Sequence, residues 1–300
     1  MEAAPQRETH VYKAVDDCAI KADVFGAQPG GAKPAVVWIH GGGLIFGSRT
    51  TPRPALLAAL LQAGAVVVSI DHRLAPETKL ADIVDDVCDA WRWVVEQGPP
   101  RFGIDPQRVA MAGGSSGGYL TLMSGFRVAP PPRALVSFWG FGDITTPWEA
   151  EPSPHYLKTI ELISRERALE SVGTAAISEQ RPNVDRGYFY VYCRQQGCWP
   201  IEVAGHDPRV EPRWFDAFCP IRNVTAHYPP TMLVHGTADS DVPCEESQNM
   251  AARLVDAGVV CEPVLLDGIG HGLAGAPPEV VAAVEGRAAA FLLAHMNQAR

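Results

Sequence analysis

Two adjacent serines lie within a run of small residues, and either of them could act as a nucleophile. The segment RVAMAGGSSGGYL begins with apolar residues and then turns into glycines and serines. This order is typical of a strand, a tight turn and a helix, in which a GxSxG turn presents a serine at the carboxyl end of the strand. One GxSxG frame is centred on Ser115 and the other on Ser116. The spacing alone does not choose between them.

A serine hydroxyl needs a base within hydrogen-bond reach, and the base needs a carboxylate that orients it. Downstream of the serines, the segment HGTADSDVP offers Asp239 and Asp241, and GIGHGL offers His271. The HGxxD spacing favours Asp239. His271 lies in a glycine-rich loop after the strand expected at 260–266, which completes the chain order serine, aspartate, histidine. We therefore expect one of the two serines to meet Asp239 and His271.

The segment VVWIHGGGLIFGS could supply the hydrogen-bond donors that an acyl transfer needs. Its apolar half predicts a strand at 35–39, and the HGGG run follows directly. Glycines let backbone N–H groups point at a carbonyl oxygen that side chains would otherwise block, and such donors stabilise the negative charge that develops there. The alternative is that the glycines form only a flexible turn. We expect His40, in this run, and His235, in HGTAD, to make structural hydrogen bonds, and His206 to contact the inserted segment described below.

The composition argues against several other kinds of chemistry. No GxxxxGK[ST] motif is present and the serine turn holds no GxGxxG, so nucleotide binding is disfavoured. The formal net charge is −9 without a basic stripe, so we expect no nucleic-acid partner. The seven cysteines include no CxxC pair, which favours reduced, mostly buried thiols over a zinc site, and we give little weight to a Cys193–Cys198 pair. We expect no metal and no cofactor.

The sequence also shows no sign of export or membrane insertion. No charged start is followed by an apolar stretch, and no window reaches about 18 uninterrupted apolar residues. We therefore expect a cytoplasmic protein with no stable membrane anchoring.

Strands and helices are expected to alternate along most of the chain, which indicates a mostly parallel sheet with helices on both faces. The runs 35–39 and 65–70 are apolar throughout, as in strands that are covered on both sides. Gly98-Pro99-Pro100 is expected to end the helix at 82–95. The expected strands are 9–15, 18–25, 35–39, 65–70, 108–112, 134–139, 231–235 and 260–266, and the expected helices are 54–62, 82–95, 117–126, 246–257 and 279–296.

The segment 143–228 does not follow this alternation. It is rich in proline, has a helical pattern at 157–172 and holds eleven of the chain's 24 Phe, Trp and Tyr residues. A structureless loop of this length is not expected inside a compact domain. We therefore expect residues 1–142 and 229–300 to form the core, with 143–228 inserted as a cap or lid. Its aromatic side chains would face a largely apolar pocket, or else pack only the small core of the insertion.

Five motifs, HGGG, DHRLAPE, GGSSGG, HGTAD and GHG, occur in this order along the chain. In this set the chain resembles the α/β-hydrolase fold, and within that fold the hormone-sensitive-lipase-like carboxylesterases, with some likeness to the feruloyl and acetylxylan esterases. The resemblance implies that Ser115 is the nucleophile, in a strand and elbow similar to the family's RIAVAGDSAGG. It also implies that the backbone N–H groups of Gly42, Gly43 and Ser116 form the oxyanion hole.

The resemblance covers about residues 35–142 and 229–295, while the cap matches in position only. Within DHRLAPE it implies that Asp71, Arg73 and Glu77 brace the site. These three residues are therefore expected to be structural.

The chain departs from the family's pattern in several places, one of which is the wording of the acid loop HGTADSDVP. Gly114 stands where the family has an acidic residue before the nucleophile, and Leu44 follows HGGG where an aromatic residue is common. Both changes alter the pocket wall and leave the acyl-chain preference open. Only about 34 residues precede the HGGG strand, so the N-terminal cap helices of that subgroup are expected to be missing or reduced.

The expected function is a cofactor-free serine hydrolase that cleaves a carboxylic ester through an acyl-enzyme. Ser115 would attack, His271 would act as base and Asp239 would orient the imidazole. The substrate would be a small-molecule ester with an apolar or aromatic part, and we allow for a homodimer. The alternatives are a peptidase, a lactone hydrolase or an amide hydrolase with the same triad, and a catalytically silent ligand-binding member of the fold.

Overall fold

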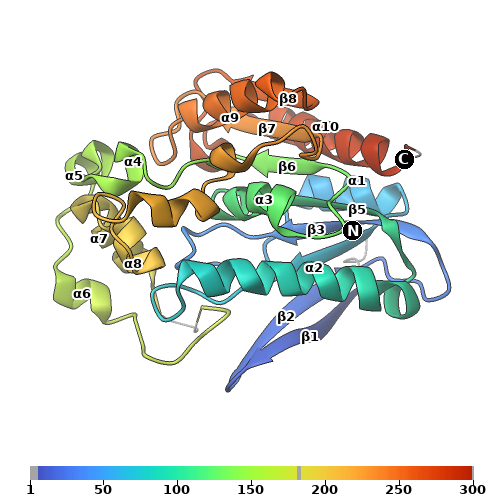
Figure 1. Ribbon diagram of the computed structural model, residues 1–300, viewed down its shortest axis with the longest axis horizontal. Helices are drawn as coiled ribbons and strands as arrows, with labels where there is room; N and C mark the ends of the chain where they lie inside the picture. Colours follow the sequence, from blue (N-terminus) through green and yellow to red (C-terminus); the bar gives the residue numbers. More distant parts are fainter. Residues whose placement is uncertain (1–5, 181–183, 299–300) are drawn as a thin grey trace.

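The structure is a computed structural model that describes residues 6–180 and 184–298. The strands in this part of the chain are β1 Arg7–Val15, β2 Cys18–Phe25, β3 Lys33–Ile39, β4 Val66–Ile70, β5 Ile104–Gly114, β6 Leu135–Phe138, β7 Thr231–Gly236 and β8 Cys261–Leu266. They form one sheet in the order β1-β2-β4-β3-β5-β6-β7-β8 (Figure 1). β2 runs antiparallel to β1 and β4, and the other pairs are parallel. The mostly parallel sheet that the sequence predicted is confirmed.

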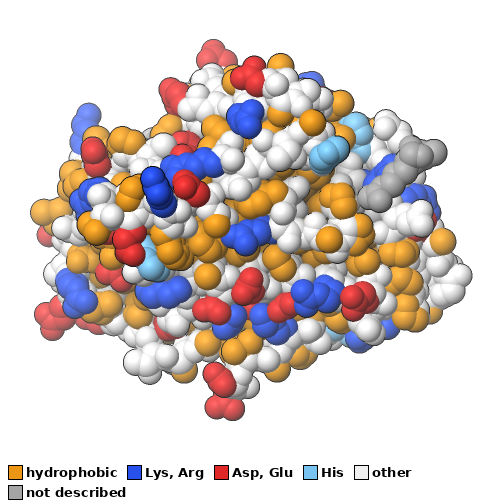
Figure 2. Space-filling model, viewed as in Figure 1, with side chains coloured by type: hydrophobic (Ala, Val, Ile, Leu, Met, Phe, Trp, Pro, Cys, Tyr) orange, Lys and Arg blue, Asp and Glu red, His pale blue; other side chains and the backbone are white. Residues whose placement is uncertain are grey.

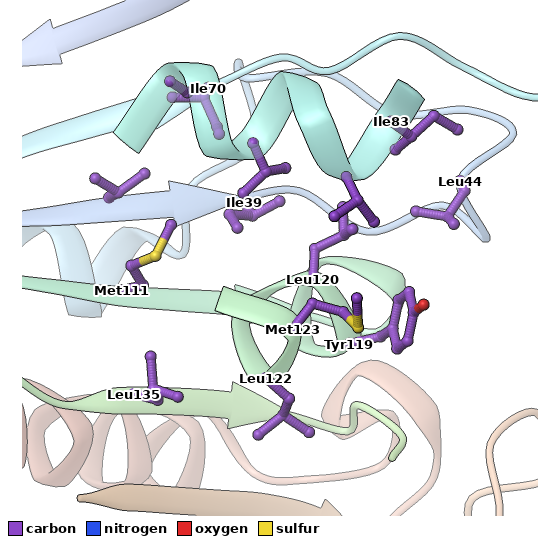
Figure 3. Packing of buried hydrophobic residues seen from close by; sticks show 14 of the residues in the cluster. Ile39, Leu44, Ile70, Ile83, Met111, Tyr119, Leu120, Leu122, Met123 and Leu135 are labelled. Carbon is purple, nitrogen blue, oxygen red and sulfur yellow. The ribbon is translucent and has the colours of Figure 1, made fainter. Parts of the chain in front are cut away.

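Helices cover both faces of this sheet. One face packs against α1 Pro54–Gln62 and α10 Pro278–Met296, and the other against α2 Leu80–Phe102, α3 Ser116–Arg127 and α9 Glu245–Asp256. β3 illustrates why the central strands are apolar throughout. Val36 and Trp38 pack on the α1 face, whereas Val37 and Ile39 pack on the α2 face. Figure 3 shows Ile39 on that second face, in the layer between the sheet and the helices α2 and α3.

The helix α2 extends beyond the proline pair that was expected to end it. Pro99 and Pro100 lie inside its last turn, and the helix ends only at Gly103, whose φ of 68° is left-handed. The N–H of Gly103 closes the turn on the carbonyl oxygen of Pro99. The prediction of an end at 98–100 was therefore wrong, because burial of Phe102 and the left-handed glycine decide where the chain leaves the helix.

The helical pattern at 157–172 does not form one helix. The structure has α5 Pro154–Thr159 and α6 Arg165–Leu169, with extended backbone at Ile160 between them. The side chain of Ser164 accepts a hydrogen bond from the N–H of Arg167 and so caps the start of α6. The cap at Ser164 thus starts a separate helix inside the predicted helical pattern.

The segment between β6 and β7 lies at one end of the sheet, where the short helices gather in Figure 1. Several hydrogen bonds tie it to the sheet layers, and two of them show the pattern. Trp199 Nε1 donates to the carbonyl oxygen of Gly43 at 2.9 Å, and Tyr119 Oη donates to that of Phe218 at 2.7 Å. Besides α5 and α6, its described elements are α4 Pro147–Ala150, α7 Gly187–Gln196, α8 Trp199–Ala204 and the 3₁₀ helices η1 Pro212–Phe218 and η2 Pro220–Asn223.

The surface over α2 carries charges of both signs. Figure 2 shows Lys and Arg side chains interspersed with Asp and Glu side chains on this face, without a continuous basic stripe. Within residues 6–180 and 184–298, no helix is both long and apolar enough to cross a membrane.

Candidate active site

The turn between β5 and α3 holds Ser115 in a strained backbone conformation. Its φ is 56° and its ψ is −124°, values that side-chain-bearing residues rarely adopt outside special turns. Two flanking glycines make this turn possible. A Cβ atom at Gly113 would lie 2.3 Å from the carbonyl oxygen of Gly117, and one at Gly117 would lie 2.2 Å from that of Ile39. Of the two GxSxG frames, the one centred on Ser115 therefore has the required close backbone contacts.

The two serines have different surroundings. Ser115 lines a cavity, whereas Ser116 is fully buried. The hydroxyl of Ser116 accepts a hydrogen bond from the N–H of Leu44 at 3.2 Å. Only the hydroxyl of Ser115 thus faces space that a ligand could occupy.

His271 and Asp239 lie beside Ser115, as the sequence predicted from their order and strand-end positions. His271 Nε2 is 3.2 Å from Ser115 Oγ, and His271 Nδ1 is 2.8 Å from Asp239 Oδ2. Asp239 follows β7, and His271 opens the 3₁₀ turn η3 His271–Leu273 after β8. Because the carboxyl ends of parallel strands share one edge of the sheet, residues far apart in sequence meet there. The hydroxyl of Ser115 can pass its proton to the imidazole of His271, while Asp239 holds the ring in place.

Hydrogen bonds hold the carboxylate of Asp239 in a fixed orientation. Its Oδ1 accepts the N–H groups of Asp241 and Val242, both at 2.9 Å. Its Oδ2 contacts His271 and also lies 3.2 Å from His235 Nε2. Burial alone would raise the pKa of Asp239, but the hydrogen bonds from His235 and His271 outweigh it and hold that pKa well below its usual range.

The same carboxylate makes His271 a stronger base. Burial alone would lower the pKa of His271, because it disfavours the charged imidazolium. The hydrogen bond to Asp239 and the negative charges of Asp241 and Asp239 outweigh burial and raise that pKa above its ordinary value. The site therefore favours an imidazole that accepts a proton.

Asp241, the alternative to Asp239, lies on the other side of the imidazole. Its Oδ2 is 3.7 Å from His271 Nε2, the nitrogen that faces Ser115. Asp241 is therefore not placed to orient the ring through Nδ1. Sequence reasoning did not foresee that this carboxylate would face the reacting edge of the base.

The glycine loop after β3 packs directly against the serine turn. A Cβ atom at Gly41 would lie 2.7 Å from the carbonyl oxygen of Gly114 and 3.1 Å from Ser115 Cβ. Gly42 has a φ of 118°, and a Cβ atom there would lie 2.1 Å from the carbonyl oxygen of Phe46. Only glycine fits these positions, which agrees with a shaped loop rather than a flexible turn. Among the described residues, the backbone N–H groups of Gly42 and of its neighbour Gly43 have no backbone hydrogen-bond acceptor.

A cavity of about 490 Å³ opens beside the serine. Most of its wall is apolar or aromatic, and much of that wall comes from α5, α7 and the chain between them. Two acidic residues, Asp185 and Asp241, also line it. The lining residues are Gly42, Gly43, Phe46, Ser115, Tyr156, Ile160, Ile163, Asp185, Gly187, Tyr188, Tyr190, Val191, Asp241 and His271.

The aromatic residues of the segment between β6 and β7 divide between two environments. Tyr156, Tyr188 and Tyr190 line the cavity, whereas Trp199 and Phe215 are fully buried in the hydrophobic core. Some of the aromatic residues thus face the cavity and others pack in the core, so each of the two roles expected from the sequence applies to part of the set.

Two residues of this segment matter more to the site than the sequence indicated. Arg194, only 2% exposed, donates to Asp241 Oδ1 at 3.1 Å and to the carbonyl oxygen of Trp148 at 3.0 Å. Tyr190 Oη donates to the same Asp241 Oδ1 at 2.7 Å, and its ring packs against Gly43. The spacing of four residues in GYFYVYCRQQ places Tyr190 and Arg194 on one face of α7, which was the available signal.

The predicted bracing residues are all buried and paired. Arg49 binds Asp71 at 2.6 Å, Arg73 binds Asp86 at 2.8 Å and Arg186 binds Glu77 at 2.6 Å. These ion pairs connect the segment after β4 to the loop before α1, to α2 and to the start of α7. None of the six side chains lines the cavity that holds Ser115.

The other predicted histidines contact structural partners. His40 Nδ1 lies 2.8 Å from the carbonyl oxygen of Gly41, and His235 lies between Ser247 and the backbone of Val242. His206 stacks on Trp214, a residue of its own segment, with ring centroids 4.0 Å apart.

The structure also shows what stands beside Gly114, where the family has an acidic residue. A Cβ atom at Gly114 would meet the ring of Trp139 at 3.4 Å. The indole of Trp139 therefore occupies the space into which a longer side chain would extend. Leu44, the other departure, is buried and lies outside the cavity wall.

The described residues include no group of three or more His, Cys, Asp or Glu side chains that could hold a metal ion. The thiols of Cys193 and Cys198 are both free.

The fold and this arrangement of side chains define the class of α/β proteins that present a serine on a strand-to-helix turn. A sequence profile of the alpha/beta hydrolase fold matches residues 36–275, and the chain belongs to that family. The family resemblance seen in the sequence is thereby confirmed at this level, while the likeness to feruloyl and acetylxylan esterases stays a prediction.

Two curated relatives are fungal polyketide synthases. The non-reducing polyketide synthase prhL of Penicillium brasilianum is 27% identical over 304 residues, which cover 85% of this chain and 12% of that protein. The non-reducing polyketide synthase atr1 of Stereocaulon alpinum is 38% identical over 146 residues, which cover 44% of this chain and 6% of that protein. The chain thus spans only a small part of the length of these relatives.

Two solved structures share the fold. A protein of unknown function from Staphylococcus aureus subsp. aureus Mu50 has a TM-score of 0.78 and 21% identity, over 96% of this chain and 99% of that one. A thermophilic esterase from Thermogutta terrifontis, solved with propionate bound, has a TM-score of 0.67 and 24% identity, over 97% of this chain and 94% of that one.

Proposed function

We propose that this protein is a serine hydrolase that cleaves small carboxylic esters through an acyl-enzyme. The observation that carries the proposal is the contact chain from Ser115 Oγ through His271 to Asp239, at 3.2 and 2.8 Å. The esterase among the similar structures supports an ester as the substrate. The other bonds that the same triad could cleave, a peptide, lactone or amide bond, have no observation in their favour.

In the proposed mechanism, Ser115 Oγ bonds to the ester carbonyl carbon while its proton passes to His271 Nε2. The carbonyl oxygen becomes an anion in the tetrahedral intermediate. His271 then gives the proton to the leaving alcohol oxygen as the carbon–oxygen bond breaks, and an acyl-serine remains. Water repeats the sequence on the acyl-enzyme and releases the acid. Asp239 holds the imidazole in the orientation that both transfers need.

The proposed oxyanion hole consists of the N–H groups of Gly42, Gly43 and Ser116. The contact of the glycine loop with the serine turn supports this assignment, since it brings backbone amides from both segments to the same end of the cavity. One such donor typically contributes on the order of 3 kcal/mol to transition-state stabilisation. Trp199 supports the loop from the other side, through its bond to the carbonyl oxygen of Gly43.

We further propose that residues 143–228 act as a cap on a core formed by 1–142 and 229–300. The helices α5 and α7 of this segment carry much of the cavity wall opposite the serine turn. Ile160, Ile163 and Tyr188 would contact an apolar or aromatic part of the substrate. Tyr190 joins the cap to the core because it touches both Gly43 and Asp241.

A fluorophosphonate probe followed by peptide mass spectrometry tests the proposal directly. The probe should label Ser115 in the native protein and no serine in Ser115→Ala. A series of aryl esters of increasing acyl length should be hydrolysed by the native protein and not by this variant. Labelling of another serine, or full hydrolysis by Ser115→Ala, would refute the assignment.

A further inference from the structure

Asp241 places one carboxylate oxygen against the base of the proposed triad. Its Oδ2 lies 3.7 Å from His271 Nε2, the ring nitrogen that faces the nucleophile. Its Oδ1 accepts hydrogen bonds from Tyr156 at 3.0 Å, Tyr190 at 2.7 Å and Arg194 at 3.1 Å. These three donors fix the carboxylate, and Oδ2 is the oxygen that is left for the cavity.

A buried cation balances the charge of this carboxylate. The side chain of Asp241 is 15% exposed and that of Arg194 only 2%. Glu149 Oε1 lies 3.6 Å from Arg194, but burial raises the pKa of Glu149 to about 8, which keeps it protonated at neutral pH. Arg194 is therefore available to Asp241, which it also anchors through the backbone carbonyl oxygen at 3.1 Å.

The proposed reaction determines which part of a substrate passes this oxygen. His271 Nε2 gives its proton to the leaving alcohol oxygen, which must come within about 3 Å of that nitrogen. Asp241 Oδ2 is 3.7 Å from the same nitrogen. The leaving oxygen therefore lies within about 7 Å of Asp241 Oδ2. A polar group two carbons along the alcohol can therefore reach the carboxylate.

We propose that Asp241 is a specificity-determining residue, which selects esters whose alcohol part carries a hydroxyl or ammonium donor two carbons from the ester oxygen. The inference rests on the proposed ester hydrolysis. Oδ2 accepts the hydrogen bond of this donor, and it repels an anionic alcohol part. The acyl part of the substrate then lies against the apolar and aromatic wall.

Asp185 provides a comparison within the same cavity, as a second acidic residue of the wall that is more exposed than Asp241. It is the other acidic residue among those that line the cavity, and its Oδ1 accepts the N–H of Gly187 at 2.8 Å. No contact joins it to His271. Neutralising Asp185 therefore removes one negative charge from the cavity without removing the acceptor beside the base.

Five acetate esters in two isosteric sets test the proposal. The first set is 2-(dimethylamino)ethyl acetate, a protonated amine at pH 7, with the neutral 3-methylbutyl acetate and the anionic 3-acetoxypropanoate. The second pair, 2-hydroxyethyl acetate and propyl acetate, replaces a methyl group by a hydroxyl. The measured quantity is the ratio of kcat/KM values within a set, which does not depend on the folded fraction of a preparation. The native protein, Asp241→Asn and Asp185→Asn are compared.

The native protein should prefer the cationic ester over its neutral isostere by roughly tenfold or more, the size of a charge-assisted hydrogen bond. Asp241→Asn should bring this ratio close to one and relieve the discrimination against the anionic ester. Asp185→Asn should retain the native ratios. The hydroxyl pair shows whether a neutral donor is selected as well as a cation.

Two results would overturn the proposal. Equal ratios in the native protein and in Asp241→Asn would mean that Oδ2 meets no substrate donor. An equal change in Asp185→Asn would mean that a general field, not this acceptor, sets the preference. If the native protein hydrolysed none of the five esters and no aryl ester, the proposed function itself would fail, which distinguishes the two failures.

Discussion

The hydroxyl of Ser116 accepts a hydrogen bond from the backbone N–H of Leu44, 72 positions earlier in the chain. This bond joins the serine turn to the loop that follows the glycine run. The neighbouring Ser115 makes its side-chain contact with His271 instead. The two adjacent serines thus contact different segments: Ser116 binds the loop after the glycine run, and Ser115 contacts His271.

Ser116→Ala should therefore weaken the site without removing its nucleophile. The change leaves the buried N–H of Leu44 without its acceptor, at a cost of about 1 to 3 kcal/mol. We expect kcat for an aryl ester to fall a few-fold, with fluorophosphonate labelling of Ser115 retained. In Ser115→Ala, kcat for the same ester should instead fall roughly a thousandfold or more. Full activity in Ser115→Ala together with loss in Ser116→Ala would reverse the assignment.

Gly43→Ala should disturb the glycine loop through a specific clash. The φ of Gly43 is 60°, and an added Cβ would lie 2.6 Å from the ring of Tyr190. We expect kcat to fall by about tenfold or more, because the loop amides move away from the developing oxyanion.

Gly64→Ala separates this clash from backbone strain alone. Gly64 also has a positive φ, 78°, but no atom lies within 4 Å of an added Cβ. This control should lose about 1 kcal/mol of stability and keep kcat. Equal kcat losses in the two variants would show that the contact with Tyr190 does not matter.

Arg194→Met should destabilise the protein because it leaves the carboxylate of Asp241 without its buried cation. Arg194 contacts both Asp241 and Glu149 and packs over the ring of Trp148. Removing one partner of a buried pair costs about 3 kcal/mol or more. Urea unfolding should show this loss, whereas Arg209→Met, which breaks an exposed pair with Asp207, should leave the midpoint unchanged. Matching midpoints for the two variants would contradict the role given to Arg194.

Asp241→Asn should move the acid limb of the pH profile to lower pH. The groups that act on His271 are Asp239, Asp241 and Arg194, and the two carboxylates raise the pKa of the imidazole. The negative charge of Asp241 stabilises the protonated form of His271. Without that charge the pKa of His271 falls, so the active neutral imidazole persists at lower pH. The profile of kcat/KM against pH measures this shift. An acid limb at the same pH or at a higher pH would contradict this prediction.

Glu149→Gln should change how stability depends on pH. Burial raises the pKa of Glu149 to about 8, so the folded protein binds a proton that the unfolded chain releases near its ordinary value. The stabilising effect is complete at low pH and is lost as pH rises toward 8. Unfolding free energies measured from pH 5 to pH 8 should therefore fall more steeply for the native protein than for the variant. Parallel curves would mean that this proton is not retained on folding.

Several elements were predictable because their signals are local. The all-apolar run at β3 indicated a strand covered on both faces, and the structure places its alternate side chains in two separate cores. The end of α2 was not predictable from its prolines. That end depends on the burial of Phe102 and on the left-handed turn at Gly103, and both are set by packing against the rest of the fold.

The candidate site was also predictable only in part. Its members lie at strand ends, and parallel strands bring their carboxyl ends to one edge, so the order of Ser115, Asp239 and His271 sufficed to expect their meeting. The contacts of Arg194 and Tyr190 with Asp241 could not be expected. Their spacing places them on one face of α7, but only the docking of α7 decides what that face meets.

The sequence by itself determined the sheet, the serine turn and the identity of the three side chains beside it, because short-range glycine, strand and helix preferences act within a few residues. The tertiary structure decided which oxygen of which aspartate faces each edge of the imidazole. Asp239 and Asp241 are two residues apart in one loop, and their opposite placement follows from partners that approach from distant segments. His271 takes Oδ2 of Asp239, while α5 and α7 hold Oδ1 of Asp241. Only the folded chain brings these partners together.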